Sequence, residues 1–377
     1  MFALEAQWIY RLALTFIPGI GSQSAKILLA YGGGEEGVFN LTKKQMMRIP
    51  GLARPVAHAF AEHRNSALKR AREEWTFLQS GEITPLFFMD EGYPSRLRHC
   101  PDCPLILYKS GPADLNAPMV LGVVGSRKAT PYGLSICEQI IRDMASLDVL
   151  IVSGLALGID VQAHRSALDH GLQTAAVLGH GLDLVYPAQH KHTAGRMKKQ
   201  GALLSEYPSG SKPDRENFPK RNRIVAGMVD ALLVIESGVK GGSIITASLA
   251  VDYARDVFAI PGRIGDEHSA GCHLLIKSNR AGLVENANDL MMAMNWNPHS
   301  EKAPRQMNIF PECNDDELLV LKFLEGSGEL PVDELGARLK WTPSKTSTTL
   351  MGMEFKGLVR SLPGKRYRAI REHSLPG

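Results

Sequence analysis

Cysteine is scarce in this sequence. Five of the 377 residues are cysteine, an odd number scattered along the chain: Cys100, Cys103, Cys137, Cys272 and Cys313. This usage excludes the disulfide framework typical of small secreted proteins and indicates a reducing compartment, so we expect a cytoplasmic protein. Only Cys100 and Cys103 have the spacing of half a zinc site. Because no second Cys or His pair at finger spacing accompanies them, we expect two reduced thiols in a loop.

Long apolar runs and a strong charge of one sign are also missing. The apolar stretch from Trp8 to Ile17 is short and interrupted by Arg11, and it lacks the features of a signal peptide. We therefore expect a core helix there and no membrane insertion. The net charge is only +4, so a nucleic-acid site must come from a local group of cations. With 44% apolar and 22% charged residues, the composition is that of an ordinary globular protein.

The motifs of nucleotide-dependent enzymes are absent. No Gly-x-Gly-x-x-Gly follows a predicted strand and no Walker pattern occurs, which counts against NAD binding and ATP hydrolysis. Asp160 and His164 stand four positions apart on a predicted helix, but no third partner stands at a catalytic spacing, so we interpret them as a structural pair. His180, His190 and His192 lack a carboxylate at a metal-binding spacing. We expect no enzyme activity, no catalytic residues, no metal and no cofactor.

Pattern divides the chain into four parts. Residues 1–81 are predicted to be helical, and residues 82–296 alternate apolar strands with amphipathic helices, which is typical of an α/β domain with a parallel sheet. Residues 297–313 are polar and interrupted by prolines, which predicts a linker. Residues 314–377 are predicted to form a small helical domain that ends in a hairpin. The strands expected in the central part are Val120–Val124, Val149–Val152, Thr174–Leu178, Ala202–Ser205, Ala231–Ile235 and Asp256–Ile260.

Glycine, serine, proline or charge follows each of these six strands. Ligands of open α/β sheets bind outside the carboxyl ends of the strands, so the clustering predicts one site built from several loops. For any single loop the simpler interpretation is a tight turn. Two loops are suited to phosphate: Gly125-Ser126-Arg127-Lys128, ahead of a helix that starts near Tyr132, and Gly241-Gly242-Ser243 at the start of another helix. Ser243 could instead serve only as that helix's N-cap.

A basic segment follows. Between Lys191 and Arg223 there are nine Lys or Arg residues and three acids. Its end combines cations, an aromatic ring and an amide in Phe218, Lys220, Arg221, Asn222 and Arg223. That mixture suits a single-stranded nucleic acid, because cations meet phosphates and a ring can stack on a base. A solvated basic face is the simpler alternative.

The two ends of the chain carry further patterns. Ile17–Ala25 and Ile49–Leu52 resemble helix-hairpin-helix turns, whose glycines expose N–H groups to DNA phosphates, although a packing or oligomer surface remains an alternative. At the other end, a helix from Asp315, helices near Val332–Leu339 and from Thr342, and a terminal hairpin form a winged-helix pattern. Its cations could touch DNA or its surface could bind protein: Lys345, Arg360, Lys365, Arg366 and Arg368.

Taken in order, these motifs resemble those of the DprA/Smf family of DNA-processing proteins. The resemblance is carried by Tyr93–Leu97, Leu107–Gly111, Val124–Thr130, Ser153–Asp160 with Ala163 and His164, Phe218–Gly227, and Gly242–Ala247 with Pro261 and Gly262. It implies an extended Rossmann-like domain between an N-terminal domain of the SAM or helix-hairpin-helix kind and a C-terminal winged helix.

The resemblance also implies a function. Members of the family bind single-stranded DNA as homodimers, protect incoming strands during natural transformation and help to load the RecA recombinase, and a single-strand-binding protein is a further candidate partner. Some relatives place a lysine directly after Tyr-Pro, whereas Ala188 follows Tyr186-Pro187 here. His190 or Lys191 could take the place of that lysine.

Two other function classes compete. A phosphoribohydrolase of the lysine-decarboxylase-like type has a related glycine-rich loop, but such loops continue to a catalytic glutamate, and Thr246-Ala-Ser248 offers none. A protein-interaction adaptor that uses only the terminal parts would bind no DNA through residues 82–295. The residues expected to contact nucleic acid are Gly125, Ser126, Arg127, Lys128, Lys191, Phe218, Lys220, Arg221, Asn222, Arg223, Gly241, Gly242 and Ser243.

Overall fold

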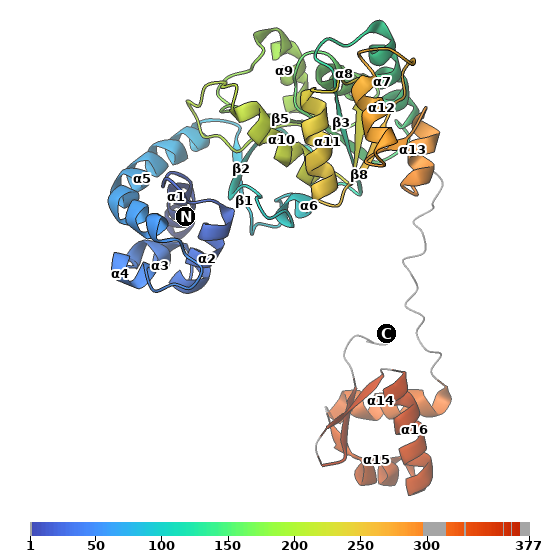
Figure 1. Ribbon diagram of the computed structural model, residues 1–377. Coiled ribbons are helices and arrows are strands. Elements are labelled where there is room, and N and C mark those ends of the chain that lie inside the picture. The colour runs from blue at the N-terminus through green and yellow to red at the C-terminus, as the bar shows by residue number, and fades with distance from the viewer. Residues whose placement is uncertain (1, 297–313, 328, 357, 363, 370–377) are drawn as a thin grey trace. The chain divides into compact units, whose positions relative to one another are not determined.

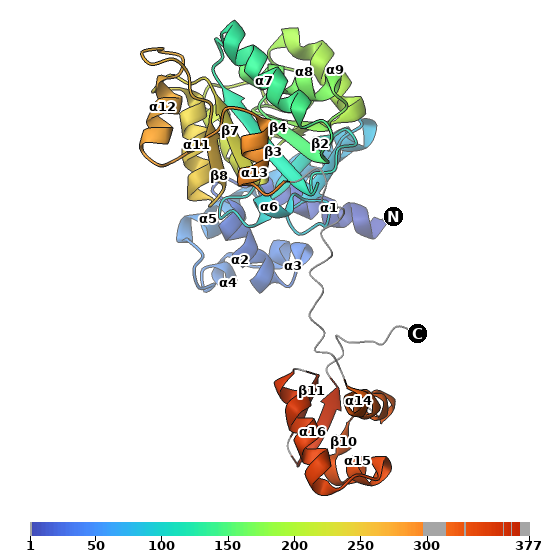
Figure 2. The same ribbon diagram turned by 90° about the vertical axis from the view of Figure 1, so that its right-hand side faces the viewer.

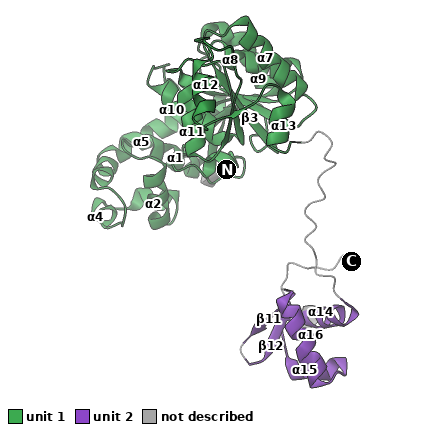
Figure 3. Ribbon diagram, turned by 45° about the vertical axis from the view of Figure 1, so that its right-hand side comes forward, with its two compact units in different colours: residues 1–298 green, residues 299–377 purple. Residues whose placement is uncertain are grey.

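The structure is a computed structural model that describes residues 2–296, 314–327, 329–356, 358–362 and 364–369. The chain forms two compact units, residues 1–298 and 299–377 (Figure 3), and each is described by itself. The predicted linker, residues 297–313, lies outside the described residues. The predicted boundary between residues 81 and 82 stays a prediction, because the helices and the sheet on its two sides belong to one unit.

The first unit contains a nine-stranded sheet. Its strands are β1 (Thr84–Phe87), β2 (Ile106–Ser110), β3 (Met119–Gly125), β4 (Val149–Ser153), β5 (Thr174–Leu178), β6 (Ala202–Ser205), β7 (Ala231–Ile235), β8 (Asp256–Ala259) and β9 (Gly282–Leu283). The spatial order is β1-β2-β6-β5-β4-β3-β7-β8-β9. Strands β3 to β9 pair in parallel, whereas β1 and β2 are antiparallel additions at one edge. The six predicted strands are confirmed to within one residue at each end.

Helices cover both faces of this sheet (Figures 1 and 2). They are α6 (Ser95–Arg98), α7 (Pro131–Asp143), α8 (Ile159–Asp169), α9 (Lys191–Gln200), α10 (Asn217–Met228), α11 (Gly242–Asp252), α12 (Ala270–Lys277) and α13 (Ala287–Ala293). Side chains alternate along β3: Leu121 and Val123 pack with residues of α7 and α8, while Val120 and Val124 pack with residues of α10 and α11. The parallel sheet is therefore apolar on both sides, as a doubly covered sheet requires.

Five helices precede the sheet: α1 (Phe2–Thr15), α2 (Ser22–Gly32), α3 (Glu35–Asn40), α4 (Lys43–Met46) and α5 (Arg54–Ser80). The stretch from Trp8 to Ile17 begins inside α1 and is largely buried, with Leu12 fully covered, so the prediction of a core helix is confirmed. Trp8 stacks on Trp75 of α5, with ring centroids 6.1 Å apart. Among the described residues, no helix is long and apolar enough to cross a membrane.

The second unit is a winged helix, as predicted. It comprises α14 (Asp315–Ser327), β10 (Leu330–Pro331), α15 (Val332–Leu339), α16 (Pro343–Phe355), β11 (Val359–Leu362) and β12 (Arg366–Ala369). Its three strands form a sheet of order β10-β12-β11. The predicted cap at Asn314 is present: its side chain accepts from the N–H of Glu317, and Glu317 accepts in return from the N–H of Asn314.

Candidate nucleic-acid interface

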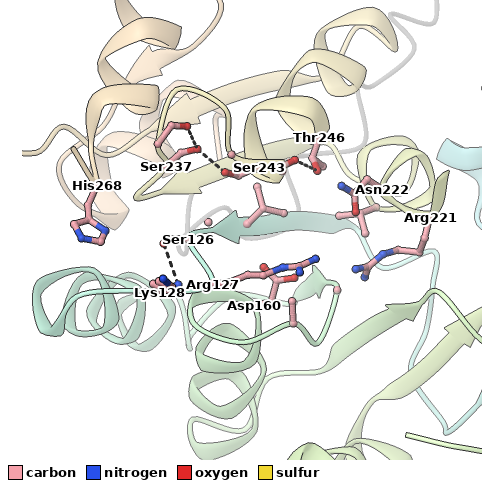
Figure 4. Close-up of a pocket in the computed structure, with 18 of the residues that line it drawn as sticks. Ser126, Arg127, Lys128, Asp160, Arg221, Asn222, Ser237, Ser243, Thr246 and His268 are labelled. Carbon is pink, nitrogen blue, oxygen red and sulfur yellow. Dashed lines mark hydrogen bonds between the residues drawn. The ribbon is translucent and has the colours of Figure 1, made fainter. Parts of the chain in front are cut away.

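A cavity of about 520 Å³ opens at the carboxyl ends of β3, β4 and β7 (Figure 4). We call it the strand-end cavity. Arg127 and Asp160 lie on one wall, and Ser237, Ser243 and Thr246 lie on the wall opposite. Nine of the thirteen predicted contact residues line it: Gly125, Ser126, Arg127, Lys128, Arg221, Asn222, Gly241, Gly242 and Ser243. The structure thus brings together loops that lie more than 100 positions apart in the sequence.

Three helices begin near the strand-end cavity, and two of these starts are already occupied by the protein's own groups. At α7, the hydroxyl of Thr130 accepts from the N–H of Gly133, and the N–H of Thr130 donates to Glu236. At α8, the N–H groups of Ile159 and Val161 donate to the backbone carbonyls of Ser126 and Ala156. The start of the helix after Gly125–Lys128 is therefore partly taken up, because the N–H groups of Thr130 and Gly133 already have acceptors within the protein.

The start of α11 is different. Its N-cap is Gly241, and in the described structure no side chain caps it. Ser243 is therefore not the N-cap. Its hydroxyl lies 2.6 Å from that of Ser237, which fixes the loop without blocking the helix start. An uncapped helix start presents N–H groups and the positive end of the helix dipole, so α11 offers the open anion site of this cavity.

The cations of the cavity fall into two kinds. Arg127 and Lys128 are exposed, and within the described ranges neither forms an ion pair with an acid. Arg221 is only 3% exposed and donates to the carbonyl of Val177. Burial raises the pKa of the nearby Asp160, while the charge of Arg221 opposes that rise. Arg127 also acts on Asp160, but only Arg127 and Lys128 are exposed, so these two present positive charge to solvent at the cavity.

Asp160 and His164 do not form the structural pair that their spacing suggested. The Nδ1 atom of His164 lies 2.7 Å from the hydroxyl of Thr174, away from the carboxylate of Asp160. Burial lowers the pKa of His164 to about 3, and the charge of Arg221 adds to that effect. His164 is therefore neutral, beneath the cavity rather than inside it.

Phe218 lies beside the cavity, not in its lining. The guanidinium of Arg127 is 5.7 Å from the centre of its ring, and the ring of Tyr186 is 6.0 Å from it, centroid to centroid. Tyr186 is half exposed and was not among the predicted contacts. Of the two substitutes considered for the lysine replaced by Ala188, His190 is buried and bonded to the carbonyl of Leu155, so only Lys191 is exposed.

Lys220 and Arg223 do not line the strand-end cavity. Lys220 is exposed, with its ammonium 3.7 Å from a carboxylate oxygen of Glu216. Arg223 forms an ion pair with Glu206 and lines a second cavity of about 510 Å³, which we call the N-terminal cavity. That cavity lies between the start of α2, residues 101–106 and this ion pair. The basic segment therefore does not form one surface, although its role in binding stays a prediction.

Sequence reasoning missed several residues of the strand-end cavity lining, six of which are Asp160, Ser237, Gly238, Thr246, Glu267 and His268. Ser237 and Gly238 belong to the loop that follows β7, so the strand-end rule could have included them. Glu267 and His268 belong to the exposed loop between β8 and α12, and no motif marks them.

Some of the residues that the sequence suggested as DNA contacts in the N-terminal helices and the winged helix already have partners within the protein. In the first helix-hairpin-helix-like turn, the hydroxyl of Ser22 donates to the carbonyl of Pro101, so the turn packs against the sheet-bearing part of its own unit. In the winged helix, Lys345 pairs with Asp316 and Arg366 pairs with Glu329. The wing cations without an acid partner in the described part are Arg360, Lys365 and Arg368.

Cys100 and Cys103 are free and buried, as are the other described cysteines. Burial raises the pKa of both thiols. No group of three or more His, Cys, Asp or Glu suited to a metal ion occurs among the described residues.

Comparison with known proteins gives consistent matches. Residues 84–295 match the family model of DNA recombination-mediator protein A, and residues 304–365 match that of the DprA winged helix domain. A putative DNA processing protein DprA of Mycobacterium tuberculosis is 36% identical over 302 residues, which cover 79% of this chain and 75% of that protein.

Two solved structures are similar as well. The X-ray structure of DprA from Streptococcus pneumoniae has a TM-score of 0.63 and 34% identity and covers 75% of this chain and 96% of its own. A DprA from Helicobacter pylori, described for its single-stranded-DNA binding mode, has a TM-score of 0.52 and 27% identity and covers 57% of this chain and 96% of its own.

Proposed function

The chain belongs to the DprA/Smf family of DNA-processing proteins, and from that premise we propose that it binds single-stranded DNA without reading its sequence. One observation carries the proposal: the uncapped start of α11 and the unpaired cations Arg127 and Lys128 face the same strand-end cavity. These groups suit phosphates, which every DNA sequence presents alike.

A base-stacking surface stands next to these phosphate-binding groups. The ring of Phe218 lies under Arg127 and against Tyr186, so a strand whose phosphates enter the cavity can place a base on an aromatic face. Stacking of this kind tolerates any base. The H. pylori relative, described for its binding of single-stranded DNA, supports the same ligand class.

We further propose the finer role that the family resemblance implies. The protein protects incoming strands and helps to load RecA on them during natural transformation or recombination, as a homodimer in the cytoplasm. A single-strand-binding protein is a candidate partner. The buried, free thiols fit a reducing compartment.

The protein acts as a binder in this proposal, not as an enzyme. Glu236, the carboxylate at the end of β7, is 3% exposed and already accepts from Thr130. Asp160 is engaged by backbone N–H groups and by Arg221. Neither carboxylate is free to act as general acid or base in the way a phosphoribohydrolase requires. Release of free base from nucleoside monophosphates at useful rates would favour the enzyme instead.

The binding proposal is tested by titrating labelled oligonucleotides of several sequences against salt. Each phosphate neutralised should contribute about −0.7 to the log-log slope for a single strand. We expect a steep slope that is equal for all sequences. A flat response, or a strong preference for one sequence, would overturn the proposal.

A further inference from the structure

Two side chains of helix α5 form hydrogen bonds to one residue of the loop between β6 and α10. The carboxylate of Glu74 accepts from the backbone N–H of Ser209 at 2.9 Å and from its hydroxyl at 2.5 Å. Arg70 donates to the carbonyl of Ser209 at 3.0 Å and to Glu74 at 2.8 Å. We call Arg70, Glu74 and Ser209 the α5 latch. Every polar group of Ser209 is held by it.

The burial of Glu74 marks the α5 latch as more than a surface contact. Glu74 is 1% exposed, although a buried carboxylate is costly unless it is paired and hydrogen-bonded. Here one cation and two donors, all within the latch, offset that cost. Glu73, the preceding residue of the same helix, is exposed, so the chain places one of two adjacent glutamates in this contact.

The loop that contains Ser209 leads to the proposed DNA-binding residues. Beyond Ser209 the loop is held at Ser211, whose carbonyl accepts from the N–H of Gly181 at 3.0 Å. It then exposes the cations Lys212 and Arg215 before α10 begins with Asn217 and Phe218. In the described structure neither Lys212 nor Arg215 forms an ion pair. Their placement depends on the course of the backbone, which the α5 latch fixes upstream.

We propose that Arg70 and Glu74 are positioning residues for the binding of single-stranded DNA: they hold the loop of residues 206–216 so that its cations extend the surface of Arg127 and Phe218. This inference rests on the proposed function. A loop that is already ordered in the free protein loses little entropy when DNA binds. A mobile loop must be ordered at that moment, and each side chain immobilised then weakens the affinity. The N-terminal helices thus contribute to binding without touching the strand.

The experiment uses the full chain and three variants: Glu74→Gln, Ser209→Ala and the control Glu73→Gln. The first readout is native trypsin cleavage after Arg215, since Lys212 precedes Pro213 and resists cleavage. The second is the dissociation constant for a labelled thymidine oligonucleotide and its salt dependence. A purely structural role would change stability alone and leave the salt slope as it is.

For Glu74→Gln and Ser209→Ala we expect faster cleavage at Arg215 and binding weaker by about three- to tenfold, because one or two side chains are no longer ordered in advance. The salt slope should also become shallower by about 0.7 for each phosphate that the loop no longer neutralises. The control should match the wild type in every readout. Ser209→Ala removes one hydroxyl, so it carries the test if Glu74→Gln fails to fold.

Two outcomes overturn the inference. Either cleavage at Arg215 is unchanged in both variants, or cleavage is faster while affinity and salt slope stay at wild-type values. Failure of the proposed function looks different, because the wild type itself would then show no salt-dependent binding.

Discussion

Two cavities of the first unit are nearly equal in size and differ in charge. The strand-end cavity, of about 520 Å³, and the N-terminal cavity, of about 510 Å³, each lie at an uncapped helix start, α11 in one and α2 in the other. Arginines of the predicted binding set line both: Arg127 and Arg221 in the first, Arg223 in the second. Arg127 has no acid partner in the described part, whereas Arg223 is paired with Glu206. The size of a cavity and an uncapped helix start therefore do not by themselves identify an anion site. The cations of the cavity must also be free of acid partners.

A contrast in exposure exists within the strand-end cavity. Arg221 is buried, as is Asp160, whose charge favours its guanidinium, while Arg127 and Lys128 are exposed and form no ion pair among the described residues. We infer that the buried charges stabilise the fold and the exposed cations bind the ligand. The following tests separate these roles, in order of the expected effect.

The largest effect should come from Asp160→Asn, which removes the buried carboxylate whose charge favours the buried guanidinium of Arg221. Leaving a buried charge uncompensated costs up to about 3–5 kcal/mol of unfolding free energy. Chemical denaturation measures the loss. The matched control is Asp169→Asn, since Asp169 forms an exposed ion pair with Arg196 and such pairs contribute only about 0–1 kcal/mol. Equal midpoints for the two variants would contradict the structural role of Asp160.

The buried layer beneath the strand-end cavity should also respond to pH. Because the pKa of His164 is lowered to about 3 in the folded protein, the unfolded chain binds more protons between about pH 3 and 6.5. Stability contributed by His164 is therefore present above about pH 6.5 and is lost as the pH falls, by up to a few kcal/mol. Denaturation midpoints at several pH values measure it. His164→Gln should flatten the dependence of stability on pH. The control His192→Gln, at an exposed site, should leave it as it is. An unchanged pH profile in His164→Gln would refute the assignment of this dependence to His164.

In the N-terminal cavity, Arg223→Ala should lower stability by about 1–3 kcal/mol, because it leaves the largely buried carboxylate of Glu206 without its partner. Burial raises the pKa of Glu206, so part of the loss is relieved by protonation. DNA affinity should change by less than about twofold if this cavity holds no phosphate. Thermal unfolding and oligonucleotide titration on the same sample decide between the two roles.

The smallest effect should come from Gly242→Ala. The added methyl group meets no atom within 4 Å, and the backbone N–H at the start of α11 remains. Affinity should stay within about twofold, since alanine keeps the donor on which the site depends. Gly241→Ala is the matched contrast, because its methyl group would lie 2.6 Å from the hydroxyl of Ser237. Similar affinities for both variants would show that the loop of α11 is not part of the site.

The six longer parallel strands of the sheet, β3 to β8, could be predicted from the sequence because their apolar runs are continuous. A strand covered on both faces, such as β7, needs apolar side chains at every position. The edge strands β1 and β9 escaped prediction for the opposite reason: β1 contains Pro85 and β9 has two residues, and neither is fully buried. Edge strands tolerate such residues, so their sequences carry little signal.

The candidate site could be predicted at the level of loops but not of individual side chains. Residues 221 and 223 are two positions apart in a basic run, yet they lie about 200° apart around α10 and line different cavities. Counting the charges in a segment does not reveal which face of the helix each charge lies on. The occupation of the α7 start by Glu236, over a hundred positions away, likewise follows from sheet order and from no local motif.

The most direct test of the central claim compares the salt dependence of single-stranded-DNA binding in Arg127→Ala and Arg223→Ala. If phosphates bind in the strand-end cavity, Arg127→Ala should weaken binding of all sequences by about tenfold and make the log-log slope shallower by about 0.7. Arg223→Ala should leave the slope at its wild-type value. The reverse pattern, with the slope changed by Arg223→Ala alone, would place the phosphates in the N-terminal cavity and contradict the account.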